Sequence, residues 1–169
     1  IENHNYKTDK ADKKIFSQFK KYKTFIAAST HESEELFAAR THILLNKRNK
    51  NIITIIIPRH INRVGQIISE ISELGLKVVT RSSNKVELKN IDIFIVDTFG
   101  ESKKFYKFAT TVFLGKSIVK GGGQNPLEPA RFGAKILHGP GVSNFKDVYK
   151  YLKQLKISSE VNSPKKCAN

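Results

Sequence analysis

Residues 52–57, Ile52-Ile53-Thr54-Ile55-Ile56-Ile57, give the clearest indication of the fold. Five of the six residues are isoleucine, and an apolar run without polar alternation is typical of a parallel strand covered on both faces. Pro58 follows directly and ends the strand, because proline has no N–H group to donate to a sheet. The run therefore predicts a central strand of a parallel sheet.

Shorter apolar runs on both sides of this stretch predict the other strands. They lie at residues 24–28, 76–80, 93–96, 111–114 and 135–138, with a short extended piece at 85–88. Helices are predicted between them, from Ser29 to near Asn46, from Asn62 to Gly75, and over residues 101–108, 126–132 and 144–155. Strands that alternate with helices in this way predict a Rossmann-like α/β domain: an open parallel sheet of five or six strands with helices on both faces.

The chain ends are more polar than this central part. Residues 1–23 are rich in lysine and predict a linker or the start of the domain, with at most a short helical turn around Ile15, Phe16 and Phe19. Residues 24–157 form the predicted Rossmann-like domain, and residues 158–169 a polar tail that holds the single cysteine, Cys167. The sequence contains no methionine, so we expect a processed protein or an excised domain.

The formal net charge is +15, from 30 basic and 15 acidic residues. Such a charge favours an anionic partner: nucleic acid, a nucleotide or an acidic membrane surface. The basic residues are mostly scattered lysines and do not form the arginine and aromatic stripes that read bases, so no nucleic-acid partner is predicted. A compositional bias toward lysine explains most of the charge. No apolar run reaches the length of a membrane span.

Residues 121–130, Gly-Gly-Gly-Gln-Asn-Pro-Leu-Glu-Pro-Ala, are the strongest candidate for a binding site. Three glycines permit positive φ angles and a close approach of the backbone to a ligand. Asn125 is a candidate N-cap, Pro126 suits the first helical position, and Glu128 has capping-box spacing. A helix start behind a bare loop predicts a phosphate site, although a purely structural turn is an open alternative. Pro129 predicts an irregular first turn.

Several polar segments follow predicted strands. They are Ser29-Thr30, Pro58-Arg59-His60, residues 97–100, residues 115–117 together with the glycine loop (residues 121–125), and residues 138–140. Ligands of open parallel sheets bind outside the carboxyl ends of the strands. We therefore expect these segments to meet at one edge of the sheet and to form the site together.

Other motifs in the sequence do not support a specific chemistry. Residues 114–117, Leu-Gly-Lys-Ser, resemble the end of a phosphate-binding Walker A loop, but Thr110 stands where its first glycine is required. His31-Glu32 lacks the second histidine of a zinc-protease helix, and no cluster predicts a metal site. His42 is predicted to be a surface residue of its helix, whereas His31 and His60 are expected at the ligand edge as caps or contacts.

Four blocks, taken together and in order, resemble one enzyme family. They are residues 27–32 (Ala-Ala-Ser-Thr-His-Glu), 58–60 (Pro-Arg-His) with Arg63, 97–101 (Asp-Thr-Phe-Gly-Glu) and 122–130. The chain resembles the C-terminal half of 3-deoxy-D-manno-octulosonic acid (Kdo) transferases over about residues 24–155. The resemblance implies one half of a GT-B glycosyltransferase, the half that binds the donor CMP-Kdo for transfer to a lipid A precursor in lipopolysaccharide synthesis.

The resemblance also implies site residues. The loop backbone and the helix start are expected to hold the phosphate of CMP. Arg59 is expected to contact the phosphate or the base region, and Glu128 to accept hydrogen bonds from the ribose hydroxyls. The turn at residues 98–100 is expected to line the cytosine pocket. The full set of expected donor contacts is Arg59, Thr98, Phe99, Gly100, Ser117, Gly122, Gly123, Asn125 and Glu128. Further candidates are Ser29, Thr30, His60, Lys116 and Gln124.

In this family the acceptor domain, the membrane anchor and the catalytic carboxylate precede the donor domain. The resemblance therefore implies no catalytic residue in this segment, no metal or other cofactor, a soluble segment, and a full-length protein at the cytoplasmic face of the inner membrane. Gln124 stands where the family usually has histidine, and Lys116 where glycine is usual. A donor domain for a UDP or GDP sugar and a basic nucleic-acid module are the alternatives.

Overall fold

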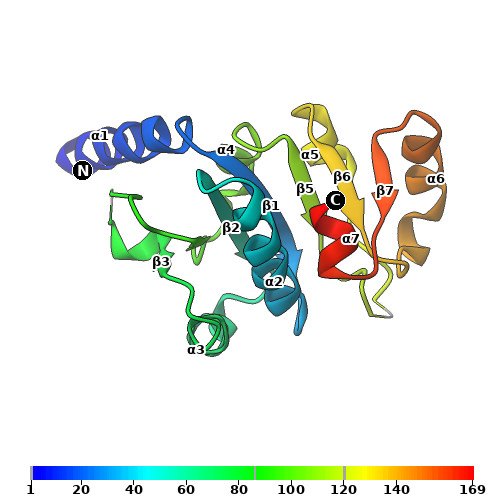
Figure 1. Cartoon of the computed structure of the whole chain (residues 1–169). Coiled ribbons are helices and arrows are strands. Elements are labelled where there is room, and N and C mark those ends of the chain that lie inside the picture. The colour runs from blue at the N-terminus through cyan, green and yellow to red at the C-terminus, as the bar shows by residue number, and fades with distance from the viewer. Residues whose placement is uncertain (1, 86, 120) are drawn as a thin grey trace.

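The computed structural model describes residues 2–85, 87–119 and 121–169, with the backbone alone for residues 2–9 and 11. It shows an open sheet of seven parallel strands in the order β3-β4-β2-β1-β5-β6-β7 (Figure 1). The strands are β1 (Lys23–Thr30), β2 (Ile52–Pro58), β3 (Val78–Thr80), β4 (Ile93–Ile95), β5 (Thr111–Leu114), β6 (Lys135–His138) and β7 (Ser158–Glu160). The predicted Rossmann-like parallel sheet is confirmed, with more strands than the five or six expected.

Within the described residues, seven α-helices and three short 3₁₀ turns precede, connect and follow the strands. The helices are α1 (Glu2–Phe19), α2 (Glu34–Arg48), α3 (Val64–Ser72), α4 (Ser102–Tyr106), α5 (Leu127–Arg131), α6 (Lys146–Gln154) and α7 (Pro164–Ala168). The 3₁₀ turns are η1 (Ile61–Arg63), η2 (Arg81–Ser83) and η3 (Ser143–Phe145). Between 85 and 88 the described residues form no strand, so the extended piece expected there is wrong.

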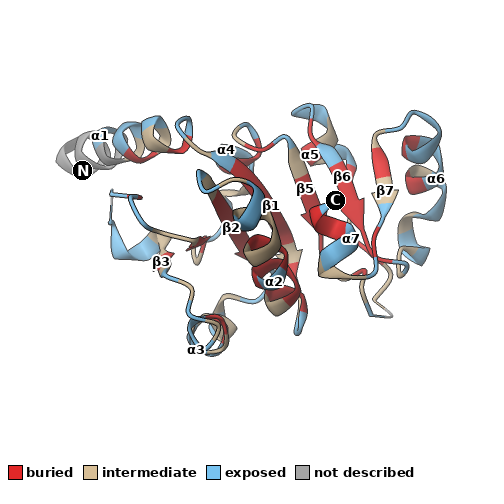
Figure 2. Ribbon diagram, viewed as in Figure 1, coloured by how far each residue is buried: buried red, intermediate tan, exposed pale blue. Residues whose placement is uncertain are grey.

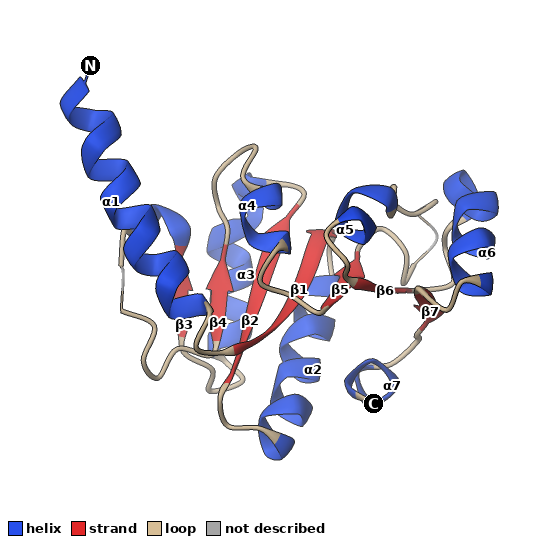
Figure 3. Ribbon diagram, turned by 90° about the horizontal axis from the view of Figure 1, so that it is seen from above, coloured by secondary structure: helices blue, strands red, loops and turns tan. Residues whose placement is uncertain are grey.

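The isoleucine run of β2 shows why the sheet carries helices on both faces. Ile53, Ile55 and Ile57 belong to one core with α1, α4 and α6, whereas Ile56 belongs to a second core with α2, α3 and α7. Alternate side chains of a strand point to opposite faces, so an all-apolar strand needs two cores. The buried residues concentrate on the strands and on the helix sides that face them (Figure 2). Helices lie on both sides of the sheet (Figure 3).

The helix α1 replaces the linker predicted for the first 23 residues. Ile15 and Phe19, four residues apart, are buried, and the ring of Phe19 packs edge-on against Phe94 at 5.1 Å between centroids. Residues at this spacing share one helix face. The rest of the segment is polar on every side, so its sequence shows no helical period.

The segment predicted as a polar tail instead completes the fold. Strand β7 extends the sheet beside β6, and α7 packs against α2. Ser163 caps α7 by accepting a hydrogen bond from the Lys166 N–H at 3.1 Å, and Pro164 begins the helix. Cys167 is buried in the second core, and this burial raises the pKa of its thiol to about 12. The thiol is a packing group at neutral pH.

Two predicted helix starts and one predicted surface residue are wrong. Helix α2 begins at Glu34, after Ser33, and α3 begins at Val64 after the turn η1, so neither Ser29 nor Asn62 is an N-cap. His42 is fully buried, and its Nδ1 lies 2.8 Å from the Thr54 hydroxyl. Burial lowers the pKa of His42, so its ring is neutral at physiological pH. The hydrogen bond between this ring and Thr54 links α2 to β2.

A charged network joins α1 to the turn that follows β4. Arg81 donates to Asp12 of α1 at 2.5 Å and to Glu101 at 3.1 and 3.2 Å, and Lys104 lies 3.1 Å from Glu101. Partial burial alone would raise the pKa of Glu101. Hydrogen bonds from Arg81, Thr98 and Lys104 outweigh this effect and lower the pKa from 4.5 to about 2. The network holds the turn at residues 97–100 against the body of the domain.

The lowered pKa predicts a specific pH dependence of stability. A carboxyl whose pKa is lower in the folded state stabilises the fold above its unfolded pKa, and this contribution is lost as pH falls toward the folded value. Thermal unfolding of the wild type and Glu101→Gln should differ by a constant amount above about pH 5, and the difference should shrink between about pH 4.5 and 2. The exposed Glu73→Gln serves as the control. A difference that is unchanged at low pH would contradict this role.

Candidate functional site

The carboxyl ends of four neighbouring strands form the edge predicted for the site. In the order β2-β1-β5-β6 these strands end at Pro58, Thr30, Leu114 and His138, and the predicted polar segments follow each of them. Neighbouring strands lie about 4.8 Å apart, so the ends of β2 and β5 are about 10 Å from each other. The predicted convergence at the carboxyl edge is confirmed.

Glu34, the first residue of α2, organises this edge. Its side chain is fully buried, and its two oxygens accept four backbone N–H groups. One oxygen accepts from Ser117 at 2.9 Å and Ile118 at 3.2 Å, and the other from His31 at 3.0 Å and Lys116 at 2.8 Å. A buried carboxylate with four donors fixes the loop after β5 to the loop after β1. The sequence interpretation missed Glu34, because nothing local distinguishes it from an ordinary helix-start carboxylate.

Ser117 joins the loops after β5 and β6. Its buried hydroxyl donates to the Leu114 carbonyl at 2.6 Å and accepts from the Gly139 N–H at 2.9 Å. A Cβ atom at Gly139 would lie 2.2 Å from the Ser117 carbonyl oxygen, so only glycine fits there. The Ser117 hydroxyl thus has both a donor and an acceptor partner within the protein, and its contact with a donor substrate stays a prediction. Thr30 is similar: it is buried, and its hydroxyl donates to Glu35 at 2.9 Å.

The glycine loop adopts the conformation that its sequence predicts. Gly122 and Gly123 have φ angles of 86° and 80°, which non-glycine residues rarely adopt. The Gly123 N–H donates to the Lys116 carbonyl at 2.8 Å, and the Gly122 carbonyl accepts from Asn144 N–H at 2.9 Å. The N–H groups of Gly121 and Gly122 donate to no residue within the described ranges. Two backbone donors are therefore available to a ligand.

A cavity of about 640 Å³ opens beside these two donors, and we refer to it as the carboxyl-edge cavity. Its lining residues come from the loops after β5 and β6: Lys116, Gly121, Gly122, Pro140, Gly141, Val142, Ser143 and Asn144. A volume of this size is typical of small-molecule sites. The lining combines free N–H groups, one ammonium group and two polar side chains, a set that suits an anion.

Lys116 occupies an unusual backbone position in this cavity. Its φ angle is 56°, in the left-handed region that favours glycine. The structure thus gives a physical reason why glycine is the usual residue of the resembled family at this position. Lysine accepts backbone strain here and adds a positive charge to the cavity.

Replacing Lys116 with glycine should separate these two effects. The expected result is a free energy of unfolding that is unchanged or higher by up to about 1 kcal/mol, because strain is released. Affinity for a phosphate ligand should fall several-fold, because the ammonium group is lost. Chemical denaturation and nucleotide titration measure the two quantities. The matched control is Lys156→Gly, because Lys156 is an exposed lysine with a φ of 59° that does not line the cavity. Unchanged affinity would remove Lys116 from the site.

The helix after the loop differs in detail from the prediction. Helix α5 begins at Leu127, whose N–H donates to the Asn125 side chain at 3.0 Å, so Asn125 caps the turn. No hydrogen bond from Glu128 closes a capping box among the described residues. Glu128 lies 3.6 Å from Lys103, and its side chain is 44% exposed. The Glu128 carboxylate is therefore available to a ligand, whereas α5, at five residues, is too short to have a strong dipole.

The remaining candidates lie along the same edge but outside the carboxyl-edge cavity. Thr98 donates to Glu101, and Phe99 is 86% exposed, which is unusual for so large an apolar side chain. Arg59 is exposed, with its backbone N–H bound to the Thr30 carbonyl at 3.0 Å. His60 lies edge-on to His31 at 5.4 Å between ring centroids. Four further candidates also lie outside this lining: Ser29, Gly100, Gly123 and Gln124.

The cavity also includes residues that the sequence interpretation did not place in the site. Ser143 and Asn144 line it, and Asn144 had been expected only as a helix start. Asn144 packs so closely on the glycine loop that a Cβ atom at Gly122 would lie 2.3 Å from its side-chain nitrogen. The run Gly139-Pro140-Gly141 after a strand was the signal for a second loop at this edge.

The Arg63 and Glu35 pair supports the loop that carries Arg59. The Arg63 guanidinium donates to both oxygens of Glu35, at 3.1 and 3.4 Å, and Glu35 is only 1% exposed. Breaking one partner of a buried pair is destabilising, so we assign Arg63 to the support of the loop. Arg59 has no such partner among the described residues, which leaves its guanidinium free at the edge.

Comparison with known proteins supports a relationship to glycosyltransferases. No protein-family model matches the chain. The 3-deoxy-D-manno-octulosonic acid transferase of Haemophilus influenzae is 31% identical over 139 residues, which are 82% of this chain and 33% of that protein. The enzyme of the same name from Rickettsia bellii is 31% identical over 156 residues, 92% of this chain and 37% of that protein. The chain thus spans about a third of these relatives.

A solved structure shares the fold. The crystal structure of the C-terminal CMP-Kdo binding domain of WaaA from Acinetobacter baumannii matches with a TM-score of 0.85 and 22% identity. The match covers 94% of this chain and 83% of that one. The chain is therefore similar in sequence to about a third of these 3-deoxy-D-manno-octulosonic acid transferases, and it shares the Rossmann-like fold of the solved domain.

Proposed function

We propose that the chain is the donor-binding domain of a Kdo transferase, and that it holds CMP-Kdo at the carboxyl edge of its sheet. The observation that carries the proposal is the pair of N–H groups at Gly121 and Gly122, which donate to none of the described residues and lie beside the Lys116 ammonium group and an open cavity. The sequence relatives bear the name of this enzyme, and the structural relative is described as a CMP-Kdo binding domain.

The geometry suggests how the site would assist the reaction. As the bond between Kdo and CMP breaks, negative charge develops on the leaving phosphate. Backbone N–H groups and a lysine beside that phosphate stabilise the charge without reorganisation. Glu128, half exposed at the start of α5, would accept hydrogen bonds from the ribose hydroxyls. Arg59 would contact the phosphate or base region, and the exposed Phe99 with Thr98 and Gly100 would contact the cytosine.

The proposal extends to the whole protein only through its relatives. The acceptor would be a lipid A precursor in lipopolysaccharide synthesis, at the cytoplasmic face of the inner membrane, with peripheral contact to the membrane surface. No metal would be required for transfer. No helix within the described ranges is both long and apolar enough to cross a membrane.

Nucleotide titration tests the proposal. CMP should bind more tightly than UMP or GMP, and Arg59→Ala should weaken CMP binding, whereas Arg40→Ala, an exposed arginine on α2, should not. Tighter binding of UMP or GMP would assign the domain to another donor. Tight, strongly salt-dependent binding of duplex or single-stranded nucleic acid with no nucleotide preference would favour the nucleic-acid alternative.

The chain alone should bind nucleotide without transferring sugar. Inverting transfer needs a base within hydrogen-bond reach of the acceptor hydroxyl, and the resembled family supplies this base from its other domain. Affinity of the isolated 169 residues for CMP should be modest, because in the resembled family a second domain closes over the donor. The purified chain, incubated with CMP-Kdo and a lipid A precursor, should yield no Kdo-modified lipid. Product above a control without protein would show that a base lies within these 169 residues.

A further inference from the structure

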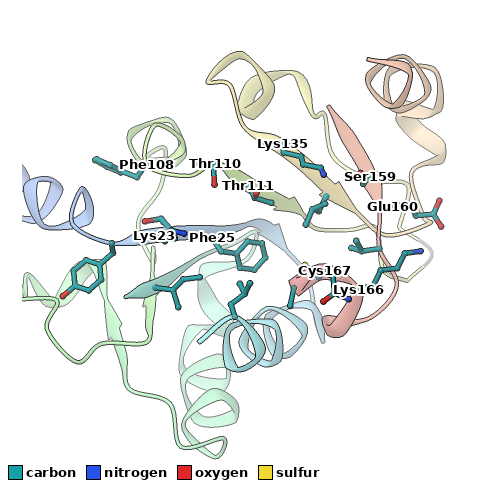
Figure 4. A pocket seen from close by; sticks show the side chains of 18 residues that line it. Lys23, Phe25, Phe108, Thr110, Thr111, Lys135, Ser159, Glu160, Lys166 and Cys167 are labelled. Carbon is teal, nitrogen blue, oxygen red and sulfur yellow. The ribbon is translucent and has the colours of Figure 1, made fainter. Parts of the chain in front are cut away.

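A second cavity, the amino-edge cavity, lies at the opposite edge of the sheet from the glycine loop. Lys23, Ile52, Thr111 and Lys135 are the first residues of β1, β2, β5 and β6, and all four line it. Parallel strands all begin at the same edge, so the cavity opens at the edge opposite the glycine loop. It extends along the face of the sheet to Glu160 and Val161, at the carboxyl end of β7. Its volume is about 690 Å³, and residues 166–169, from the end of α7, form one wall (Figure 4).

The floor of the amino-edge cavity is apolar. Phe25 and Leu137 come from the sheet and are 4% and 7% exposed, and Leu45 of α2 and Cys167 of α7 face the same space. Val161, directly after β7, completes the surface. These side chains belong to or pack against the second core, so the cavity opens that core to solvent. A ligand with an apolar part would bury this surface favourably.

The rim of the cavity is basic. Three exposed lysines line it: Lys23, Lys135 and Lys166. Glu160 is the one acidic side chain in the lining. Within the described part of the chain none of these three lysines forms an ion pair, and the hydroxyls of nearby lining residues, Thr110, Thr111 and Ser159, add neutral hydrogen-bonding groups. Figure 4 shows lysines from β1, β6 and α7 around the same cavity. The rim therefore attracts a negative charge.

Thr24 of β1 does not contribute to this site. Its hydroxyl is buried and has no hydrogen-bond partner among the described residues, but Thr24 alternates with Phe25 in β1. Its side chain therefore points to the opposite face of the sheet from the apolar floor.

We propose that the amino-edge cavity binds an amphipathic anion: an alkyl or acyl chain that ends in a carboxylate or phosphate. The chain packs on Phe25, Leu137 and Val161, and the head group lies among the lysines. A sugar or nucleotide fits less well, because its many polar atoms would be buried against the apolar floor without partners. A free single-chain amphiphile and a lipid of an anionic membrane share this chemistry.

Decyl phosphate, used below its micellar concentration, is the probe for the free amphiphile. It should bind the chain in a calorimetric titration, and more tightly than decanol or inorganic phosphate. The double variant Lys135→Gln/Lys166→Gln should weaken binding at least tenfold. The matched control Lys150→Gln/Lys153→Gln removes two exposed charges of α6 that do not line the cavity, and it should bind like the wild type.

Thr111→Phe provides a test that does not depend on charge. This substitution places an aromatic ring at the mouth of the cavity, on a strand that favours aromatic residues. It should abolish decyl phosphate binding and leave the melting temperature and CMP binding unchanged. Retained CMP binding shows that the nucleotide site is intact, so this proposal and the proposed function can fail separately.

Vesicles distinguish the two sources of the ligand. If the ligand is a membrane lipid, the chain should sediment with phosphatidylglycerol vesicles but not with phosphatidylcholine vesicles. The Lys135→Gln/Lys166→Gln variant should then no longer sediment with them, whereas the control variant should. Binding of monomeric decyl phosphate alone would assign a free amphiphile. The proposal is overturned if neither probe binds, or if inorganic phosphate binds as tightly as decyl phosphate. It is also overturned if the two double lysine variants weaken decyl phosphate binding by the same factor.

Discussion

Replacing Glu34 with alanine should lower the free energy of unfolding by about 3 kcal/mol or more and abolish CMP binding. The reason is that four backbone N–H groups, from His31, Lys116, Ser117 and Ile118, donate to this one buried carboxylate. Alanine offers no acceptor, and the space left is lined by donors. The loops after β1 and β5 should then no longer be held against each other, and the glycine loop should lose its conformation.

Glu34→Gln keeps the shape and makes this prediction testable if the alanine variant does not fold. One oxygen remains an acceptor, but the amide nitrogen faces N–H donors, so an intermediate loss of stability is expected. Glu32→Ala, an exposed neighbour, is the control. Chemical denaturation and CMP titration measure both effects. A Glu34→Ala variant as stable as the control would show that the carboxylate does not hold the edge together.

Replacing Glu128 with alanine should weaken CMP binding about tenfold and change the free energy of unfolding by less than about 0.5 kcal/mol. Glu128 closes no capping box among the described residues, and its one ion pair, to Lys103, is exposed on both sides. Exposed pairs contribute little to stability, whereas a charged hydrogen bond to a bound ribose is stronger.

Two outcomes of the Glu128 experiment would be decisive. A variant whose melting temperature falls while CMP affinity holds would give Glu128 a purely structural role. A variant that loses affinity as predicted, next to an unaffected Glu73→Ala control just after α3, would place the ribose at the start of α5. Tyr106 adds a further check: burial, with a smaller contribution from the Glu128 charge, raises the pKa of its hydroxyl to about 12, so the Glu128 variant should titrate this tyrosine at lower pH.

The architecture was predictable because its signals are local. The isoleucine run of β2 predicted a strand covered on both faces, and β5 and β6 have the bounds that the sequence predicted. The glycine loop was predictable for the same reason, since Gly122 and Gly123 are needed where φ is positive. Parallel topology then brought separate loops to one edge by a general rule.

The rest depended on long-range contacts. Helix α1 packs on the domain through Ile15 and Phe19 and through the ion pair between Asp12 and Arg81. Asp12 and Arg81 are 69 residues apart, so no local sequence pattern reveals their contact. Strand β7 is three residues long and is stabilised mainly by pairing with β6. Glu34 acts on backbone groups more than 80 residues away, and His42 is buried because Thr54 lies opposite it. Such partners are visible only in three dimensions.

Amide NMR during a CMP titration shows whether CMP binds at the glycine loop. Saturable shifts of the Gly121, Gly122 and Asn144 amides are expected, with the amides of Thr24 and Thr111 at the opposite edge unchanged. The same titration with UMP should need higher concentrations. Saturable shifts at the amino edge alone, or no shifts at the glycine loop at millimolar CMP, would show that CMP does not bind there.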